Sequence, residues 1–161
     1  KPLTVNIDGV DLPARPNYVY HTNSVDGKVL ASFSDGTPAI VSHPFGRGRI
    51  IISLFSPEAQ VAYLKGAFDR ADAPAYYKVY ALIMKAAGVK PNFYTDNPYV
   101  VVKEHKIDAK RSIVSVMNYS DSAEEYTVGA TVGYQVKKVL YGELDGKLNK
   151  NDAVIYEVEK Y

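Results

Sequence analysis

The sequence predicts an α+β protein in which a mixed sheet with two helices is followed by a small antiparallel β-sandwich. Three observations lead to this prediction. Apolar and polar residues alternate through much of residues 1–55, as they do in strands. Apolar residues recur at helical spacing in residues 57–88, and the period of two returns from Asn92 onward. We therefore expect two domains, residues 1–92 and 93–161.

The first half contains a series of short segments with the alternation of strands. They are residues 4–8, 18–23, 29–34, 38–45 and 49–55. Asp35-Gly36 is a turn signal, and Gly46-Arg47-Gly48 predicts a hairpin connection between the last two segments. Residues 50–52 are three consecutive isoleucines, so both faces of that strand are apolar. This pattern is typical of an interior strand that is covered on each side.

Two helices are expected next. Ser56 is a good N-cap, Pro57 fits the first helical position and Glu58 favours a helix N-terminus, so the first helix runs from Pro57 to about Phe68. The second helix covers residues 74–88 and ends at Gly88, a residue that commonly closes helices.

The second half returns to strands. The strand-like segments are residues 99–107, 111–120, 124–130, 134–141 and 153–161. They follow one another at short intervals with turn signals between them, which favours a small antiparallel sandwich.

Composition excludes several classes of function. The 19 basic and 18 acidic residues nearly cancel, so nucleic acid is not an expected partner. The absence of cysteine excludes disulfides, zinc–thiolate sites and a cysteine nucleophile. No run approaches the ~18 apolar residues of a membrane span, and no membrane partner is expected. No signal peptide is visible, and the compartment is not assigned. Because the sequence begins Lys1-Pro2-Leu3 without a Met, we expect a processed or excised piece of a longer protein.

No catalytic, metal or cofactor site emerges from the residues. The three histidines are isolated and have no metal-ligand spacing. The glycine-rich turn at residues 46–49 leads into a strand, whereas a phosphate loop leads into a helix N-terminus. A glycosidase needs two carboxyl groups that flank a bond. Nothing in the sequence pairs any of the candidates, which are Glu104, Glu124, Glu125, Glu143, Glu157 and Glu159.

Tyrosine is the outlier of the composition, with 14 residues and no tryptophan. Scattered tyrosines are typical of half-buried strands. The other interpretation is stacking on sugars, with Tyr119 and Tyr126 as candidate sugar contacts if both are exposed.

Several segments together resemble a known family. Residues 35–41 (DGTPAIV), residues 45–49 (FGRGR) and the helix that ends in residues 86–89 (AAGV) resemble the closing part of a class I glutamine-amidotransferase-like domain. The form they resemble is the trimerisation domain of family 42 β-galactosidases and related bacterial glycosidases. Residues 113–120 (IVSVMNYS) and 154–158 (VIYEV) resemble strands of the all-β C-terminal domain that follows it in those enzymes.

The resemblance implies a role without catalysis. Active glutaminase domains end the corresponding strand on His-Pro-Glu, in which His is the base; here the triplet is Ser56-Pro57-Glu58. A serine hydroxyl is not a base near neutral pH, so Ser56 and Glu58 occupy a degenerate triad position and keep only a capping role. The family's catalytic glutamates lie in a (β/α)₈ barrel, which these residues do not contain.

The first hypothesis is therefore an accessory C-terminal region of a bacterial glycoside hydrolase, β-galactosidase-like. Its partners would be the catalytic barrel and further copies in a homo-oligomer. The alternative is a carbohydrate-binding β-sandwich module. A free-standing enzyme of amidotransferase-like descent is a third hypothesis, against which the absent cysteine and Ser56 both weigh.

Overall fold

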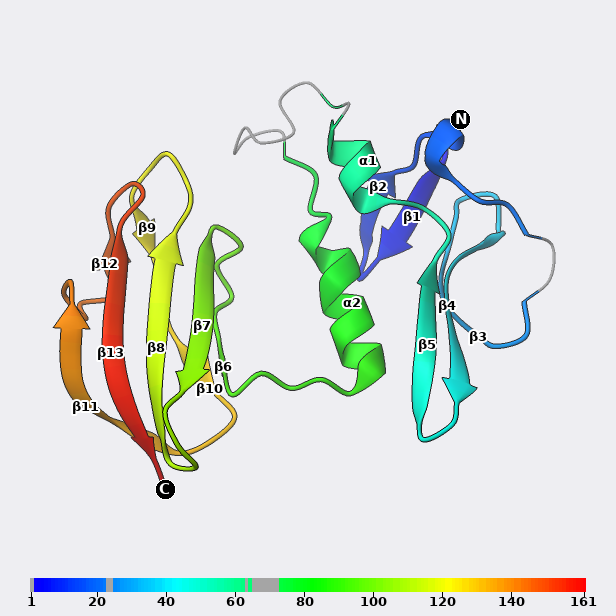
Figure 1. The fold of residues 1–161 in the computed structure, drawn as a ribbon. Coiled ribbons are helices and arrows are strands. Elements are labelled where there is room, and N and C mark those ends of the chain that lie inside the picture. Colours follow the sequence, from blue (N-terminus) through cyan, green and yellow to red (C-terminus); the bar gives the residue numbers. More distant parts are fainter. Residues whose placement is uncertain (1, 23–24, 63, 65–72) are drawn as a thin grey trace. The chain divides into compact units, whose positions relative to one another are not determined.

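The computed structural model describes residues 2–22, 25–62, 64 and 73–161. It divides into two compact units, Lys1–Val89 and Lys90–Tyr161 (Figure 1). Each unit has its own buried cluster of apolar residues. Among the described residues, no helix is long and apolar enough to cross a membrane.

The first unit consists of short strands and two helices. Its elements are β1 (Thr4–Ile7), β2 (Val10–Pro13), the 3₁₀ turn η1 (Pro16–Tyr18), β3 (Lys28–Ser32), β4 (Pro38–Phe45), β5 (Gly48–Ser53), α1 (Pro57–Ala62) and α2 (Tyr77–Ala87). Strands β1 and β2 form a hairpin, and a second sheet has the order β3–β4–β5. The β1–β2 hairpin turns at Asp8 and Gly9, both with positive φ, as a two-residue hairpin loop requires. The expected hairpin of residues 38–55 is confirmed as β4–β5.

The core of the first unit lies on one face of the β3–β4–β5 sheet. Ala31, Ile40 and Ile51 belong to this core, together with Val79 of α2. Helix α2 contacts both β5 of the sheet and β1 of the hairpin, so it connects the two across the core. In the central strand β4, residues 39–42 are buried on both faces, whereas Ile50 and Ile52 of the edge strand β5 are exposed on one.

Three expectations for the first half are wrong. All strand pairs among the described residues are antiparallel, so the mixed sheet does not form; short hairpin connections cannot join parallel neighbours. The described part of the segment at residues 18–23, residues 18–22, forms no strand, because Pro16 starts a local turn in which the Tyr18 amide donates to the Arg15 carbonyl. Strand β5 is an edge strand rather than an interior one, and Ile50 and Ile52 are 44% and 51% exposed.

Two of the predicted helix ends, Pro57 and Gly88, are confirmed. Helix α1 begins at Pro57, while its expected end near Phe68 lies outside the described residues. Helix α2 begins at Tyr77, later than expected, because the Tyr76 amide is already used in a turn with the Pro74 carbonyl. It ends at Gly88, which has φ +72° and donates its amide to the Lys85 carbonyl.

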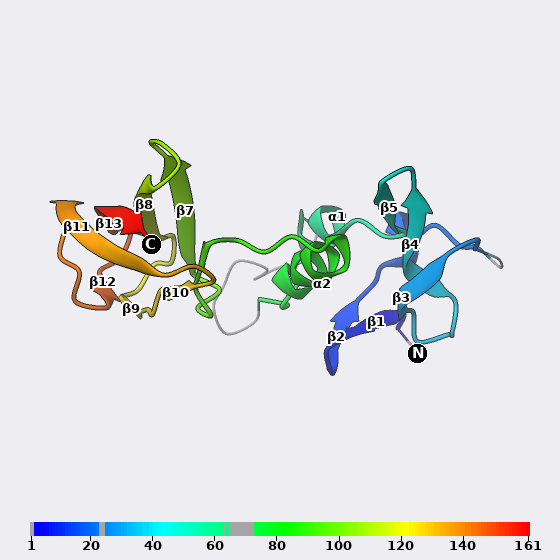
Figure 2. The same ribbon diagram turned by 90° about the horizontal axis from the view of Figure 1, so that it is seen from below.

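The second unit is built on a four-stranded antiparallel sheet. Its elements are β6 (Phe93–Tyr94), β7 (Val100–Lys106), β8 (Arg111–Asn118), β9 (Glu124–Glu125), β10 (Gly129–Ala130), β11 (Tyr134–Tyr141), β12 (Lys147–Leu148) and β13 (Ala153–Lys160). The sheet order is β11–β13–β8–β7, and the short pairs β6–β10 and β9–β12 lie apart from it (Figure 2).

One face of the four-stranded sheet forms the core of the second unit. Val114 and Val116 of β8 pair with Tyr156 and Val154 of β13, and all four are buried. Phe93, Tyr126 and Leu148, from the segments that carry the short pairs, belong to the same cluster. The two-residue strands thus supply the second layer that an antiparallel sheet needs on its apolar face.

Replacement of Gly88 tests the closure of α2. A Cβ at this position would meet no atom within 4 Å, so Gly88→Ala is opposed by the left-handed backbone alone. We expect Gly88→Ala to reduce the free energy of unfolding of the first unit by about 1 kcal/mol. Gly88→Asn should cost less, because asparagine tolerates this conformation better. Urea unfolding followed by far-UV circular dichroism measures both, and equal losses would contradict the explanation.

Candidate functional site

The Ser56 and Glu58 side chains form a helix cap. The Ser56 hydroxyl accepts a hydrogen bond from the Ala59 amide at 3.1 Å and donates to a Glu58 carboxylate oxygen at 3.0 Å. The Tyr80 hydroxyl of α2 donates to the other Glu58 oxygen. The predicted capping role of Ser56 is therefore present in the structure.

The same cluster holds no group suited to acid–base chemistry near neutral pH. The hydrogen bond from Tyr80, with smaller contributions from the Glu58 amide and Ser56, lowers the pKa of Glu58. Burial, followed by the interaction with Glu58, raises the pKa of Tyr80 to about 12. At neutral pH the carboxylate is ionised and the phenol is protonated, so neither exchanges a proton readily.

Two of the candidate carboxylates, Glu104 (partly buried) and Glu124 (buried), are held by several hydrogen bonds. Glu104 accepts from Ser112 at 2.6 Å and from Asn92 at 2.8 Å, and it pairs with Lys160. Its burial raises the pKa, but the hydrogen bonds from Lys160 and the other two donors outweigh burial and lower it overall. Glu104 is thus an ionised structural group and not a proton donor.

Glu124 is held in a similar way by a second network. It is 3% exposed, and its oxygens accept from Ser120 at 3.0 Å and from Asn97 at 2.9 Å. Asn97 also donates to the Glu125 carbonyl and accepts from the Tyr99 amide. These bonds tie the segment before β7 to β9. Among the described residues, no group of three or more His, Cys, Asp or Glu could hold a metal ion.

The two candidate sugar-contact tyrosines do not form an exposed pair. Tyr119 is 65% exposed, whereas Tyr126 is only 8% exposed and belongs to the core of the second unit. The expectation of two exposed rings is wrong for Tyr126, because Phe93, Leu148 and the β8–β13 core cover it. Sequence alternation could not reveal this, since residue 126 follows a strand of only two residues.

Asn118, the asparagine of the Asn-x-Ser sequence at residues 118–120, is also buried. It is 2% exposed, and its amide nitrogen lies within hydrogen-bond distance of the carbonyls of Ser122, Leu148 and Asn149. A group attached to this nitrogen would disrupt the contacts between three loops. The side chain is therefore structural.

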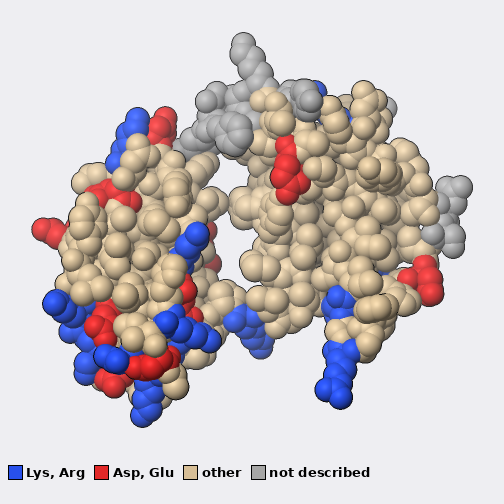
Figure 3. Space-filling model, in the orientation of Figure 1, with Lys and Arg blue, Asp and Glu red and all other residues tan. Residues whose placement is uncertain are grey.

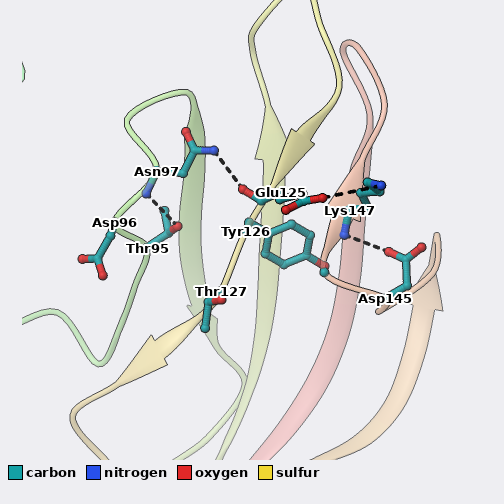
Figure 4. A pocket seen from close by; sticks show the side chains of 9 residues that line it. Thr95, Asp96, Asn97, Glu125, Tyr126, Thr127, Asp145 and Lys147 are labelled. Carbon is teal, nitrogen blue, oxygen red and sulfur yellow. Dashed lines mark hydrogen bonds and ion pairs between the residues drawn. The ribbon is translucent and has the colours of Figure 1, made fainter.

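A polar hollow of about 520 Å³ opens on the surface of the second unit (Figure 4). Three loop segments line it: residues 95–97, 125–127 and 145–147. The Asn97 amide nitrogen donates to the Glu125 carbonyl, and the Tyr126 amide donates to the Gly146 carbonyl, so the three segments are connected. Sequence analysis missed this site because its residues lie far apart in the chain. The Asp145-Gly146 turn signal was the one visible sign of it.

Comparisons with known proteins give a likeness in structure alone. No protein-family model matches the sequence, and no curated protein matches it. Three solved structures with a similar fold are β-galactosidases by name, and one of the names gives family 42 (GH42). The one from Rahnella sp. R3 has a TM-score of 0.56 and 16% identity over 100% of this chain. The GH42 enzyme from G. stearothermophilus has a TM-score of 0.53 and 17% sequence identity over 98% of this chain. The enzyme from Bacillus circulans sp. alkalophilus has a TM-score of 0.52 and 20% sequence identity over 98% of this chain.

The likeness covers nearly all of this chain and a small part of those proteins. The chain spans 21–22% of their length. At these identities the comparison shows that the fold is shared with a part of these β-galactosidases. What those proteins do does not follow for this chain from the fold.

The Ser56 cap is tested by replacement. We expect Ser56→Ala to lower the free energy of unfolding by about 1 kcal/mol, because the Ala59 amide loses its acceptor. Ser56→Thr should keep most of the stability, since its hydroxyl also accepts from that amide and can still donate to the Glu58 carboxylate. Denaturant unfolding compares the three proteins. An unchanged Ser56→Ala variant would show that the cap contributes nothing.

The Glu104 network predicts a pH dependence of stability. The pKa of Glu104 in the folded protein lies below its ordinary value of 4.5, so its contribution is complete above that pH and is lost as the pH falls through the lowered pKa. Glu104→Gln should reduce stability at neutral pH by about 1–3 kcal/mol and flatten the decline in acid. Glu143→Gln, at an exposed carboxylate, is the control. Unfolding midpoints between pH 3 and pH 7 give the answer, and parallel curves for Glu104→Gln and the parent chain would refute it.

Proposed function

We propose that this chain is a non-catalytic C-terminal region of a bacterial glycoside hydrolase of the β-galactosidase type. The first unit would be the closing part of an amidotransferase-like domain, and the second unit its C-terminal β-domain. The motifs at residues 35–41 and 45–49, together with the shared fold, support this assignment. Its role would be structural: packing against the catalytic part and supporting contacts between subunits.

The observation that carries the proposal is an uncovered apolar face of the first unit. Val29 pairs with Val41, Val41 with Ile52, and His43 with Ile50, so these five residues share one face of the β3–β4–β5 sheet. We call this the β5 face. Val29, Ile50 and Ile52 are 39%, 44% and 51% exposed, and no described helix or strand of the first unit packs over them. Val41 is buried, and the Asp26 carbonyl lies 2.7 Å from a His43 ring nitrogen, so only part of this face is open.

The β5 face is shaped for contact. An apolar hollow of about 160 Å³ lies on it, lined by Val25, Asp26, Val41, His43, Ile50, Ile52 and Leu54. The side of the first unit visible in Figure 3 carries few charged side chains, in contrast to the second unit. Contiguous apolar surface of this kind marks an interaction site more often than free surface. The consecutive isoleucines predicted a strand covered on both sides, and a further segment of a longer protein would supply the second cover.

The chemistry of the parent enzyme would lie outside this chain. The resemblance implies retaining hydrolysis of β-galactosides by two carboxyl groups. In this chain Glu104 and Glu124 are committed to structural hydrogen bonds, and the Ser56–Glu58 pair caps a helix. The alternative function, carbohydrate binding, draws its support from the polar hollow rather than from the tyrosine pair.

Two measurements on unaltered protein test the proposal. The native polypeptide from the source cell should have an intact mass several times that of this chain, and its N-terminal sequence should lie upstream of Lys1. The 161-residue chain itself should not hydrolyse a chromogenic β-galactoside above the buffer rate. A native polypeptide that begins at Lys1, or galactosidase activity that co-purifies with the chain through several columns, would overturn the proposal.

The β5 face is tested by alanine substitutions. We expect Ile50→Ala and Ile52→Ala to cost less than about 1 kcal/mol each in the 161-residue chain, because both side chains are half exposed. In the full native polypeptide the same changes should cost about 2–5 kcal/mol or release the region from the rest of the protein. Ile40→Ala, at a fully buried neighbour, should destabilise both proteins. Calorimetric unfolding compares them. Equal small effects of Ile50→Ala and Ile52→Ala in both proteins would show that the β5 face remains uncovered.

A further inference from the structure

Strand β5 has a free backbone edge. It pairs with β4 along its whole length, from Gly48 to Ser53, and no described strand pairs with its other side (Figure 2). An unpaired edge is a row of hydrogen-bonding groups that another strand can join. This edge is distinct from the β5 face, because it consists of backbone groups and the face consists of side chains.

The register of β5 with β4 identifies the groups on the free edge. The Leu54 amide donates to the Ala39 carbonyl at 2.8 Å. In an antiparallel pair, residues bonded in this way alternate with residues whose backbone groups point away from the partner strand. The residues of β5 whose amides and carbonyls point away from β4 are therefore Arg49, Ile51 and Ser53. No described residue forms a hydrogen bond with these backbone groups.

The other described edge strands of the two larger sheets carry features that oppose pairing with a further strand. The ladders of β3 and β11 have register shifts, and β11 also contains Lys137 and Lys138. Strand β7 ends in the polar run Lys103–Lys106. Strand β5 has a regular register, and the run Ile50–Phe55 contains no charged residue. Its edge is thus open to a partner strand, unlike the others.

The sequence of β5 also suits an interior position. Its three consecutive isoleucines are apolar on both faces, a pattern typical of strands with a neighbour on each side. The 161-residue chain does not satisfy this pattern, since Ile50 and Ile52 are half exposed on an edge strand. A neighbouring strand would bond to the outward backbone groups and place its own side chains beside both isoleucines.

We infer that a strand that precedes Lys1 in the native polypeptide pairs with the free edge of β5. The inference rests on the proposed function, in which this chain is the C-terminal region of a longer enzyme. The β-galactosidases that share its fold have room for such a strand, because this chain spans only 21–22% of their length. The incoming strand is apolar on both faces: on one face it adjoins Ile50 and Ile52, and on the other it adjoins Ile51, which packs against the core of the first unit.

Hydrogen exchange, measured by mass spectrometry at residue resolution, tests the inference on the 161-residue chain and on the native polypeptide. In the 161-residue chain, the amides of Ile50 and Ile52 should exchange slowly, because they bond to β4. The outward amides of Arg49, Ile51 and Ser53 should exchange rapidly. In the native polypeptide all of these amides should exchange slowly, since the incoming strand accepts from the outward ones.

The outcomes separate this inference from the proposed function. Rapid exchange of the outward amides in a native polypeptide longer than this chain overturns the inference alone. A native polypeptide that begins at Lys1 overturns both, and its intact mass shows this before any exchange is measured. Slow exchange of the outward amides in the 161-residue chain, to an extent that grows with its concentration, assigns the edge to a second copy and also overturns the inference.

Proline substitution tests the same backbone groups. Ser53→Pro removes an outward amide and the hydroxyl, which donates to the Phe55 carbonyl at 2.6 Å; Ser53→Ala removes the hydroxyl alone and is the matched control. In the 161-residue chain the two variants should melt at nearly the same temperature, since an edge strand tolerates proline where its amide faces water. In the native polypeptide Ser53→Pro should melt several degrees below Ser53→Ala, because the incoming strand loses a donor.

A second proline variant shows that the assay detects a lost ladder bond. The Ile52 amide points to β4, so Ile52→Pro should lower the melting temperature of the 161-residue chain and of the native polypeptide. If Ser53→Pro and Ser53→Ala melt together in the native polypeptide while Ile52→Pro melts lower, the outward amide has no partner there and the inference fails.

Discussion

The burial of one face of each sheet is the constraint on which the rest of the structure depends. In the second unit, Val114, Val116, Val154 and Tyr156 form an apolar face that cannot remain in water, and the short strand pairs exist to cover it. In the first unit, α2 and the β1–β2 hairpin cover one face of the β3–β4–β5 sheet. On the other face Val29, Ile50 and Ile52 remain partly exposed, and no described helix or strand of that unit covers them.

Burial also constrains the polar side chains next to the core, because each needs hydrogen-bond partners. Glu124 and Asn118 are buried and Glu104 is partly buried, and each takes part in several hydrogen bonds. A buried polar group without partners would destabilise the fold, so these hydrogen bonds stabilise the second unit. The exceptions among the described residues are the Tyr126 hydroxyl and the Gln60 side-chain nitrogen.

The surfaces of the two units differ in kind. The β5 face is largely apolar and suits a protein neighbour, whereas the hollow at residues 95–97, 125–127 and 145–147 is lined by polar side chains. The Ser56–Glu58 cluster belongs to neither. Its hydrogen bonds are those of a capped helix N-terminus.

Local signals in the sequence determined most of the elements of this protein. Ser56, Pro57 and Gly88 fix helix ends through hydrogen bonds and backbone angles of neighbouring residues, and the period of two fixes strands such as β8 and β13. Only the tertiary structure decided that Ile50 and Ile52 are half exposed, that Tyr126 is buried, and that three distant loops form one hollow. Burial and pocket formation depend on which segments meet in space, and periodicity along one strand carries no information about what lies opposite it.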